Sequence, residues 1–180
     1  MHTVVVPAWE GWDEKRECFV KSEAKSFVIE HSLVSLEKWE AKYKKPFLKK
    51  AQKTPEELLD YVKFMTITQN VDDEVYLHLT KDNIKEIKDY IDDPMTATKF
   101  KDDPNAKKSK EIITSELIYY WMIASNIPFE CKKWHLNRLL TLIRVCGIKN
   151  KPPKKMGKKN VMRQNSALNA ARRQRMNTRG

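Results

Sequence analysis

The chain has 180 residues, of which 41% are hydrophobic, and its 35 Lys and Arg outnumber its 24 Asp and Glu to give a formal net charge of +11 at pH 7. A chain of this length can build one hydrophobic core and is short for two. Its four glycines are too few for the many tight turns of an all-β sandwich, and they form no Gly-rich phosphate-binding loop.

The first 31 residues favour β-strands, because β-branched and aromatic residues alternate with polar ones. Phe27 and Ile29 fall on one face at a period of two, and Ser22–Ala24 has the composition of a polar turn. The predicted strands are Thr3–Val6, Cys18–Lys21 and Lys25–His31. We expect residues 1–31 to form a small hairpin sheet packed on a helical core.

Apolar residues recur at helical spacing from Ser32 onward. The first predicted helix is capped by Ser35 and stopped by Pro46, with Leu36, Trp39 and Tyr43 on one face. The second begins with Thr54-Pro55-Glu56-Glu57, which has the spacing of a capping box with proline in the first turn. Its predicted buried stripe is Leu58, Val62 and Met65.

Two further helices are predicted before a proline-containing loop. A short one covers Asp73–Leu79, and a second, capped by Thr80, runs to Ile91. The inward residues of the second are Ile84, Ile87 and Ile91. Asp92–Lys110 contains two prolines and many charges and is predicted to be an exposed loop.

The last part of the core is the most apolar. Glu111–Asn126 has little polar surface, which is typical of the central helix of a domain. After Pro128, Glu130–Cys146 is predicted to be one long amphipathic helix that ends near Gly147. Its predicted buried residues are Leu136, Leu139, Leu140 and Ile143. The expected fold is therefore mainly α with a small N-terminal β region, an α+β protein with a single helical core over residues 32–148.

The positive charge is confined to the C-terminus. Residues 149–180 contain eleven Lys and Arg and no acid, so residues 1–148 carry 24 positive and 24 negative charges. A segregated basic run is typical of an interaction tail, and we expect a flexible arm in which Ser166–Arg175 becomes helical on a partner. The candidate partner-binding residues are Lys154, Lys155, Lys158, Lys159, Arg163, Leu168, Arg172, Arg173 and Arg175. A solvated terminus without a partner is the alternative.

The sequence gives little support to a catalytic or metal-binding site. Cys131 and His135, four residues apart on one predicted helix, suggest a nucleophile and base, but no Asn or Asp is placed by sequence to orient the histidine. Adding Cys146 gives no zinc-ligand spacing. The acidic pairs Asp72-Asp73, Asp92-Asp93 and Asp102-Asp103 sit at helix ends or beside prolines, where Asp caps are common. His2, His31 and His78 are isolated. We expect no enzyme activity, metal or cofactor.

The three cysteines form no CxxC pair, which favours a reducing compartment. Residues 1–9 lack the basic leader of a signal peptide, and the longest apolar stretch, Leu117–Ala124, is too short to cross a bilayer. The expectation is a soluble, cytoplasmic protein that does not bind membranes.

Four strings carry a resemblance to a known family. They are EHSLVSLEKWEAKYKKPF (Glu30–Phe47), DPMTAT (Asp93–Thr98), IITSELIYYWMIASNIPFECKKWHLNRLLTLIRVCGIKNKPP (Ile112–Pro153) and RQNSALNAARRQRMNTRG (Arg163–Gly180). They resemble the tail assembly chaperones of siphophages and related prophages, over most of the chain after Glu30.

The resemblance implies a helper in the host bacterial cytoplasm that coats the tape-measure protein, contacts other tail proteins and is absent from the finished virion. A virion component at the tail or head–tail joint, whose basic arm contacts DNA or an acidic neighbour, is the alternative. The arm contains no Phe, Tyr or Trp, so stacking on single-stranded bases is not supported, and a protein partner is favoured over nucleic acid. Homo-oligomerisation stays open.

Overall fold

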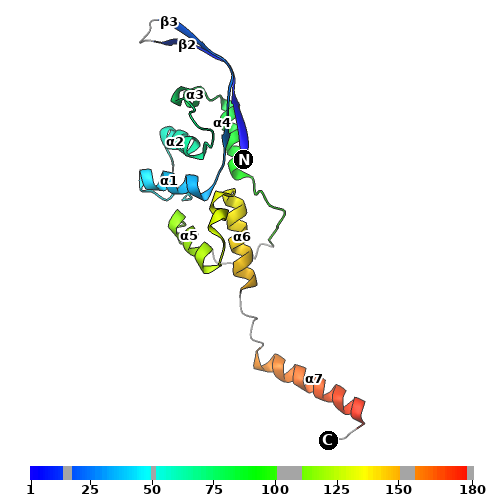
Figure 1. The fold of residues 1–180 in the computed structure, drawn as a ribbon. Coiled ribbons are helices and arrows are strands. Elements are labelled where there is room, and N and C mark those ends of the chain that lie inside the picture. Colours follow the sequence, from blue (N-terminus) through cyan, green and yellow to red (C-terminus); the bar gives the residue numbers. More distant parts are fainter. Residues whose placement is uncertain (14–17, 50–51, 101–110, 151–156, 178–180) are drawn as a thin grey trace. The chain divides into compact units, whose positions relative to one another are not determined.

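The computed structural model describes residues 1–13, 18–49, 52–100, 111–150 and 157–177 (Figure 1). The chain divides into two compact units, residues 1–148 and 149–180. In chain order the elements are β1 (His2–Val6), β2 (Trp9–Asp13), β3 (Cys18–Ser22), β4 (Lys25–Ile29), α1 (Leu33–Tyr43), α2 (Pro55–Met65), α3 (Asp73–Leu77), α4 (Lys81–Asp92), α5 (Ser115–Ala124), the 3-10 helix η1 (Phe129–Lys133), α6 (Leu136–Lys149) and α7 (Lys158–Met176). The predicted class, mainly α with a small β region, is confirmed.

The four strands form one long antiparallel ribbon with an interruption. β1 pairs with β4 and β2 pairs with β3. His2 lies opposite Ile29 and Trp9 opposite Ser22, so the register is the same on both sides of the break. The break contains Pro7, which has no amide hydrogen to donate to the ladder. Beyond it, β2 and β3 extend past the helices (Figure 1).

The predicted turn at Ser22–Ala24 is therefore wrong. Ser22 ends β3, and Glu23 and Ala24 form the interruption on the returning arm of the ribbon, so β3 and β4 follow one another and do not pair together. The strand Trp9–Asp13 was not predicted. The alternation of Phe27 and Ile29 is confirmed, since both are fully buried.

Helix α1 lies between two clusters of buried side chains. Trp39 belongs to the first cluster, and Leu33 and Leu36 belong to the second. The other buried apolar members of the first are Val4, Val6, Phe27, Ile29, Tyr61, Met65, Val75, Tyr76, Ile87 and Tyr90. Those of the second are Ile118, Met122, Ile127, Cys131, Leu136 and Leu139. Both clusters lie within residues 1–148.

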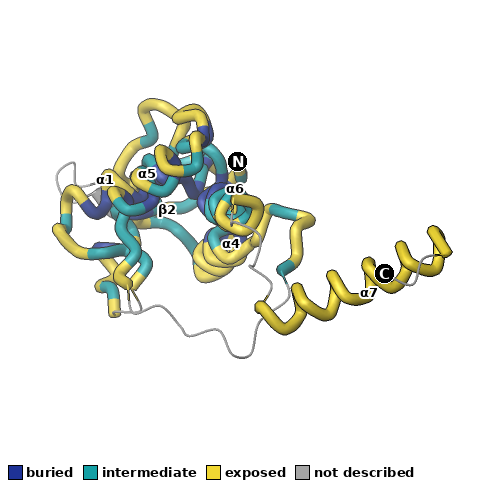
Figure 2. Tube along the Cα trace, turned by 90° about the horizontal axis from the view of Figure 1, so that it is seen from below, coloured by how far each residue is buried: buried dark blue, intermediate teal, exposed yellow. Residues whose placement is uncertain are grey.

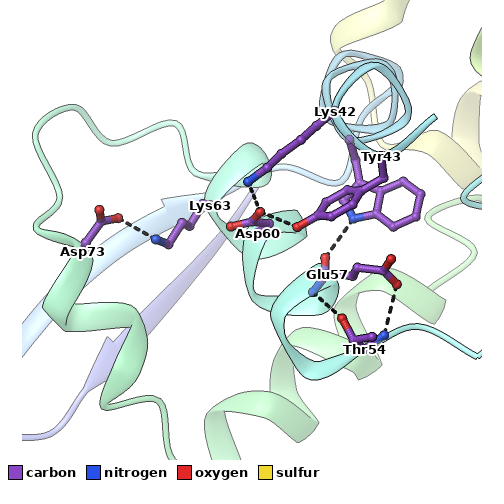
Figure 3. Close-up of polar contacts among 8 residues, drawn as sticks. Lys42, Tyr43, Thr54, Glu57, Asp60, Lys63 and Asp73 are labelled. Carbon is purple, nitrogen blue, oxygen red and sulfur yellow. Dashed lines mark hydrogen bonds and ion pairs between the residues drawn. The ribbon is translucent and has the colours of Figure 1, made fainter. Parts of the chain in front are cut away.

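Several helices begin where a side chain accepts a hydrogen bond from a free backbone amide of the first turn. Thr54 accepts from the Glu57 amide and the Glu57 carboxylate accepts from the Thr54 amide, so the predicted capping box of α2 is confirmed (Figure 3). Thr80 caps α4 as predicted. The cap of α1 is Ser32, and Ser35, predicted to be the cap, instead closes the box from the third helical position.

Two predicted stripes are rotated relative to the observed ones. Leu58 and Ile84 are exposed, whereas Tyr61 on α2 and Tyr90 on α4 are buried. Val62 is half-buried, and Met65 and Ile87 are buried as predicted. Tyrosine can lie inside because its hydroxyl finds a hydrogen-bond partner, as the Tyr61 hydroxyl does at His31. The helical spacing of apolar residues does not by itself predict that the faces with Tyr61 and Tyr90 are the buried ones.

The predicted central helix is also wrong. Glu111–Asn126 contains only the ten-residue α5, of which Ile118 and Met122 face the core while Tyr120 and Ile123 are exposed. The central position belongs to α1, which contacts α2, α5 and η1.

Glu130–Cys146 is not one helix. The chain forms η1, passes through an extended Trp134, and begins α6 at Leu136. The Leu136 amide donates to the carbonyl of His31 at 2.7 Å, and Ser32 and His135 form a β-bridge. This pairing with the segment between β4 and α1 replaces helical hydrogen bonds. Gly147 does not end α6, which continues to Lys149.

Candidate partner-binding surfaces

The histidine of the Cys131–His135 pair is engaged elsewhere. Cys131 lies in η1, outside α6, and is buried. The Nε2 atom of His135 lies 3.1 Å from the Tyr90 carbonyl, and its ring meets that of His31 edge-on with centroids 5.1 Å apart. The geometry assigns His135 to packing against His31 and the Tyr90 carbonyl.

His31 and His135 form a buried pair. The Nδ1 atom of His31 lies 2.7 Å from the Tyr61 hydroxyl, whereas Nδ1 of His135 is buried without a hydrogen-bond partner. Burial, and secondly the neighbouring His135, lower the pKa of His31 to about 3. Burial also lowers the pKa of His135. Both rings are therefore neutral at pH 7, as expected for groups taken out of water.

The acidic pairs do not form a common site. Asp72 bonds Lys25 at 2.8 Å, and Asp73 bonds Lys63 at 2.6 Å (Figure 3). Asp92 and Asp93 end α4, while Asp102 and Asp103 lie outside the described residues. Within the described ranges, no group of three or more His, Cys, Asp or Glu side chains is placed to hold a metal ion.

Side-chain hydrogen bonds also hold α1 and α2 together. Lys42 and Tyr43 both donate to Asp60, and the indole of Trp39 donates to the Glu57 carbonyl at 2.8 Å (Figure 3). Hydrogen bonds from Lys42 and Tyr43 lower the pKa of Asp60. These hydrogen bonds connect α1 to α2.

Three large apolar side chains of α5 and η1 are exposed. They are Tyr120 and Ile123, each 63% exposed, and Phe129, 53% exposed. Tyr119 has its ring 6.3 Å from that of Phe129 and its hydroxyl bonded to Glu37 at 2.7 Å. We call Tyr120, Ile123 and Phe129 the α5 patch. The near-continuous apolar sequence of α5 signalled it, because a helix apolar on all sides with one side in solvent has a free apolar face.

Most of the candidate arm residues lie on one helix, α7. The predicted Ser166–Arg175 helix is its C-terminal half, and every residue of α7 is exposed (Figure 2). The candidate residues on α7 are Lys158, Lys159, Arg163, Leu168, Arg172, Arg173 and Arg175. Lys154 and Lys155 lie outside the described residues.

Sequence reasoning missed two surfaces. The ribbon β2–β3 carries Phe19 on its surface, 73% exposed, opposite Trp12 in the register. An open groove of about 500 Å³ runs along α4 and is lined by His2, Asp82, Lys85, Glu86, Asp89, Tyr90, Asp93 and Met95. The spacing of its four acids, which puts them on one helical face, could have indicated it.

Comparison with known proteins gives no family: no protein-family model, curated protein or solved structure matches this chain. No helix in the described part of the chain is long and apolar enough to cross a membrane.

Proposed function

We propose that the protein is a non-enzymatic morphogenesis protein of siphophage tails, a chaperone that binds the tape-measure protein during tail assembly. The role comes from the sequence resemblance, and the structural observation that supports it is the α5 patch. A tape-measure protein is a long helical chain with apolar stripes, which aggregates unless those stripes are covered.

The α5 patch has the chemistry for this task. Tyr120 and Ile123 lie three residues apart on the helix, and Phe129 adds a third exposed apolar side chain. Side chains at this spacing pack against the ridges of a partner helix. The body around the patch has no net charge, since residues 1–148 hold 24 basic and 24 acidic side chains. Contact is therefore apolar and little affected by salt.

This function places the protein in the host bacterial cytoplasm before the tail is complete. The second candidate is a virion component of the tail or head–tail joint, and the fully exposed basic helix α7 favours it. A very long helical reading frame beside the gene would support the chaperone.

The test is co-expression with the long tape-measure protein. Tyr120→Ser with Ile123→Ser removes two apolar side chains of the patch, and Leu77→Ser with Ile84→Ser removes two comparably exposed ones from α3 and α4. We expect the first double variant to leave the long protein insoluble, and the control to keep it soluble as wild type does. Equal solubility with both variants would contradict the proposal.

A further inference from the structure

Helix α7 is an unusual basic surface. Over 19 residues it contains six Lys and Arg, no acid and no buried residue. Three basic residues, Lys158, Lys159 and Arg163, lie in its first two turns, and Arg172, Arg173 and Arg175 lie in its last two. Arg163 and Arg172 are separated by an uncharged stretch about 14 Å long at 1.5 Å per residue.

The charges cover about 240° of the helix circumference. At 100° per residue, Lys159 and Arg175 lie on opposite sides, about 160° apart. Four exposed apolar side chains, Val161, Met162, Leu168 and Met176, are mixed with these cations. A helix that docks in an apolar protein groove presents a stripe of large apolar side chains. The sector of α7 without charge, between Arg163 and Arg175, has no such stripe; it holds Asn160, Gln164, Ala167, Ala171 and Gln174.

The N-terminal lysines oppose the helix dipole. Lys158 and Lys159 occupy the first turn, Gly157 gives no side-chain cap, and the first turn holds no acid. Cations at this end destabilise a helix, so an anion beside them removes an unfavourable interaction. Arg173 and Arg175 sit at the end that cations favour.

Among polyanions, duplex DNA fits best. The major groove of B-DNA is about 12 Å wide and admits an α-helix, with phosphates along both walls to meet cations on opposite sides. Single strands are bound largely by aromatic stacking, and residues 149–180 contain no Phe, Tyr or Trp. The major groove of duplex RNA is too deep and narrow for side chains to read.

The uncharged middle of α7 suits the floor of such a groove. Asn165 and Asn169 lie four residues apart, on the same side as Lys158 and Arg172 within about 60°. Their amides can both donate to and accept from base edges. We infer that α7 binds duplex DNA in the major groove, with its two basic ends on the phosphates and the Asn165–Asn169 side toward the bases.

This inference goes beyond the proposed function and fails or succeeds separately, because it concerns α7 and the chaperone proposal concerns the α5 patch. Its test is fluorescence anisotropy of the full chain with a 24-base-pair duplex between 50 and 200 mM salt. About six phosphate contacts predict that affinity falls on the order of 10³-fold across this range, with a log–log slope near about −5.

Charge-removing variants locate the contact. Replacing Lys158, Lys159 and Arg163 by Gln, or Arg172, Arg173 and Arg175 by Gln, should each bring the slope to about −3. The matched control replaces the exposed Lys81, Lys85 and Lys88 of α4 by Gln, which removes the same charge and should leave the slope unchanged. An equal loss in the control would overturn the inference, because net charge alone would then explain binding.

Two measurements test the geometry. Ser166→Pro breaks the helix without changing its charge and should weaken duplex binding about tenfold or more; undiminished binding would overturn the groove contact. A single strand of the same sequence and a polyglutamate of equal charge should bind at least about tenfold more weakly than the duplex. Equal affinity for polyglutamate would show that the partner is an acidic protein.

Discussion

A side-chain oxygen of Glu40 accepts a hydrogen bond of 2.7 Å from the backbone amide of Ser115, 75 residues further along the chain. Its other oxygen accepts from the Phe47 amide at 2.8 Å. Ser115 is the first residue of α5, so the buried carboxylate satisfies a free amide at the positive end of that helix. Glu40 thus connects α1, the chain that follows it and the helix that carries the α5 patch.

Glu40→Ala should lower the free energy of unfolding by about 3 kcal/mol, because two amides lose their acceptor. Glu40→Gln keeps one amide oxygen as an acceptor and should cost about half as much. Urea denaturation measures both. The control is Glu37→Ala, which removes an exposed carboxylate from the same helix and should cost less than about 1 kcal/mol. Equal losses at the two positions would show that Glu40 has no special structural role.

Acid should destabilise the body through the buried histidine pair. Because the folded pKa of His31 is about 3 and its ordinary value is 6.5, only the unfolded chain takes up this proton between those values. The contribution of His31 to the free energy of unfolding is therefore complete above pH 6.5. Below that pH it falls by up to about 1.4 kcal/mol per pH unit. The lowered pKa of His135 adds in the same direction.

The measurement is the free energy of unfolding between pH 7 and pH 5, for wild type and for His31→Gln. The carboxylates of Glu30 and Asp93, which raise the pKa of His135, are present in both proteins. The difference between the two pH dependences therefore reports on His31. The free energy of unfolding of His31→Gln should fall less steeply with acid than that of wild type. Parallel pH curves would exclude His31 as the source of the acid sensitivity.

The two sides of α5 should respond differently to truncation. Met122 is fully buried, so Met122→Ala should cost about 2–5 kcal/mol through lost contacts and a cavity. Ile123→Ala, on the adjacent exposed position, should change stability by less than about 0.5 kcal/mol. Thermal or urea unfolding of the pair checks this. Comparable destabilisation by Ile123→Ala would mean that the patch is covered in the protein.

Residues 1–150 should fold without the arm. Both buried clusters lie within residues 1–148, and α7 buries no residue. Truncation after Asn150 should therefore change the free energy of unfolding by less than about 0.5 kcal/mol. Circular dichroism and urea denaturation of the truncated chain provide the measurement, and a chain that unfolds on truncation would place the arm within the core.

The elements that sequence predicted correctly are governed by neighbours in the chain. The Thr54 and Thr80 caps form because each threonine bonds an amide three residues later. Phe27 and Ile29 share a face because strand side chains alternate. The charge division at residue 149 is a matter of composition, as is the absence of aromatic residues from the arm.

What tertiary structure decided involves partners far along the chain. The chain between η1 and α6 is not helical because His135 pairs with Ser32, and this interrupts the predicted long helix; no local signal marks that pairing. The tyrosine faces of α2 and α4 turn inward because Tyr61 and Tyr90 find partners at His31 and Glu30. Whether α5 is central depends on which apolar faces the fold leaves uncovered. Helix caps and side-chain periodicity depend on residues close together in the sequence, so the sequence predicts them. Which apolar face of a helix is buried depends on whether its polar groups find hydrogen-bond partners far along the chain.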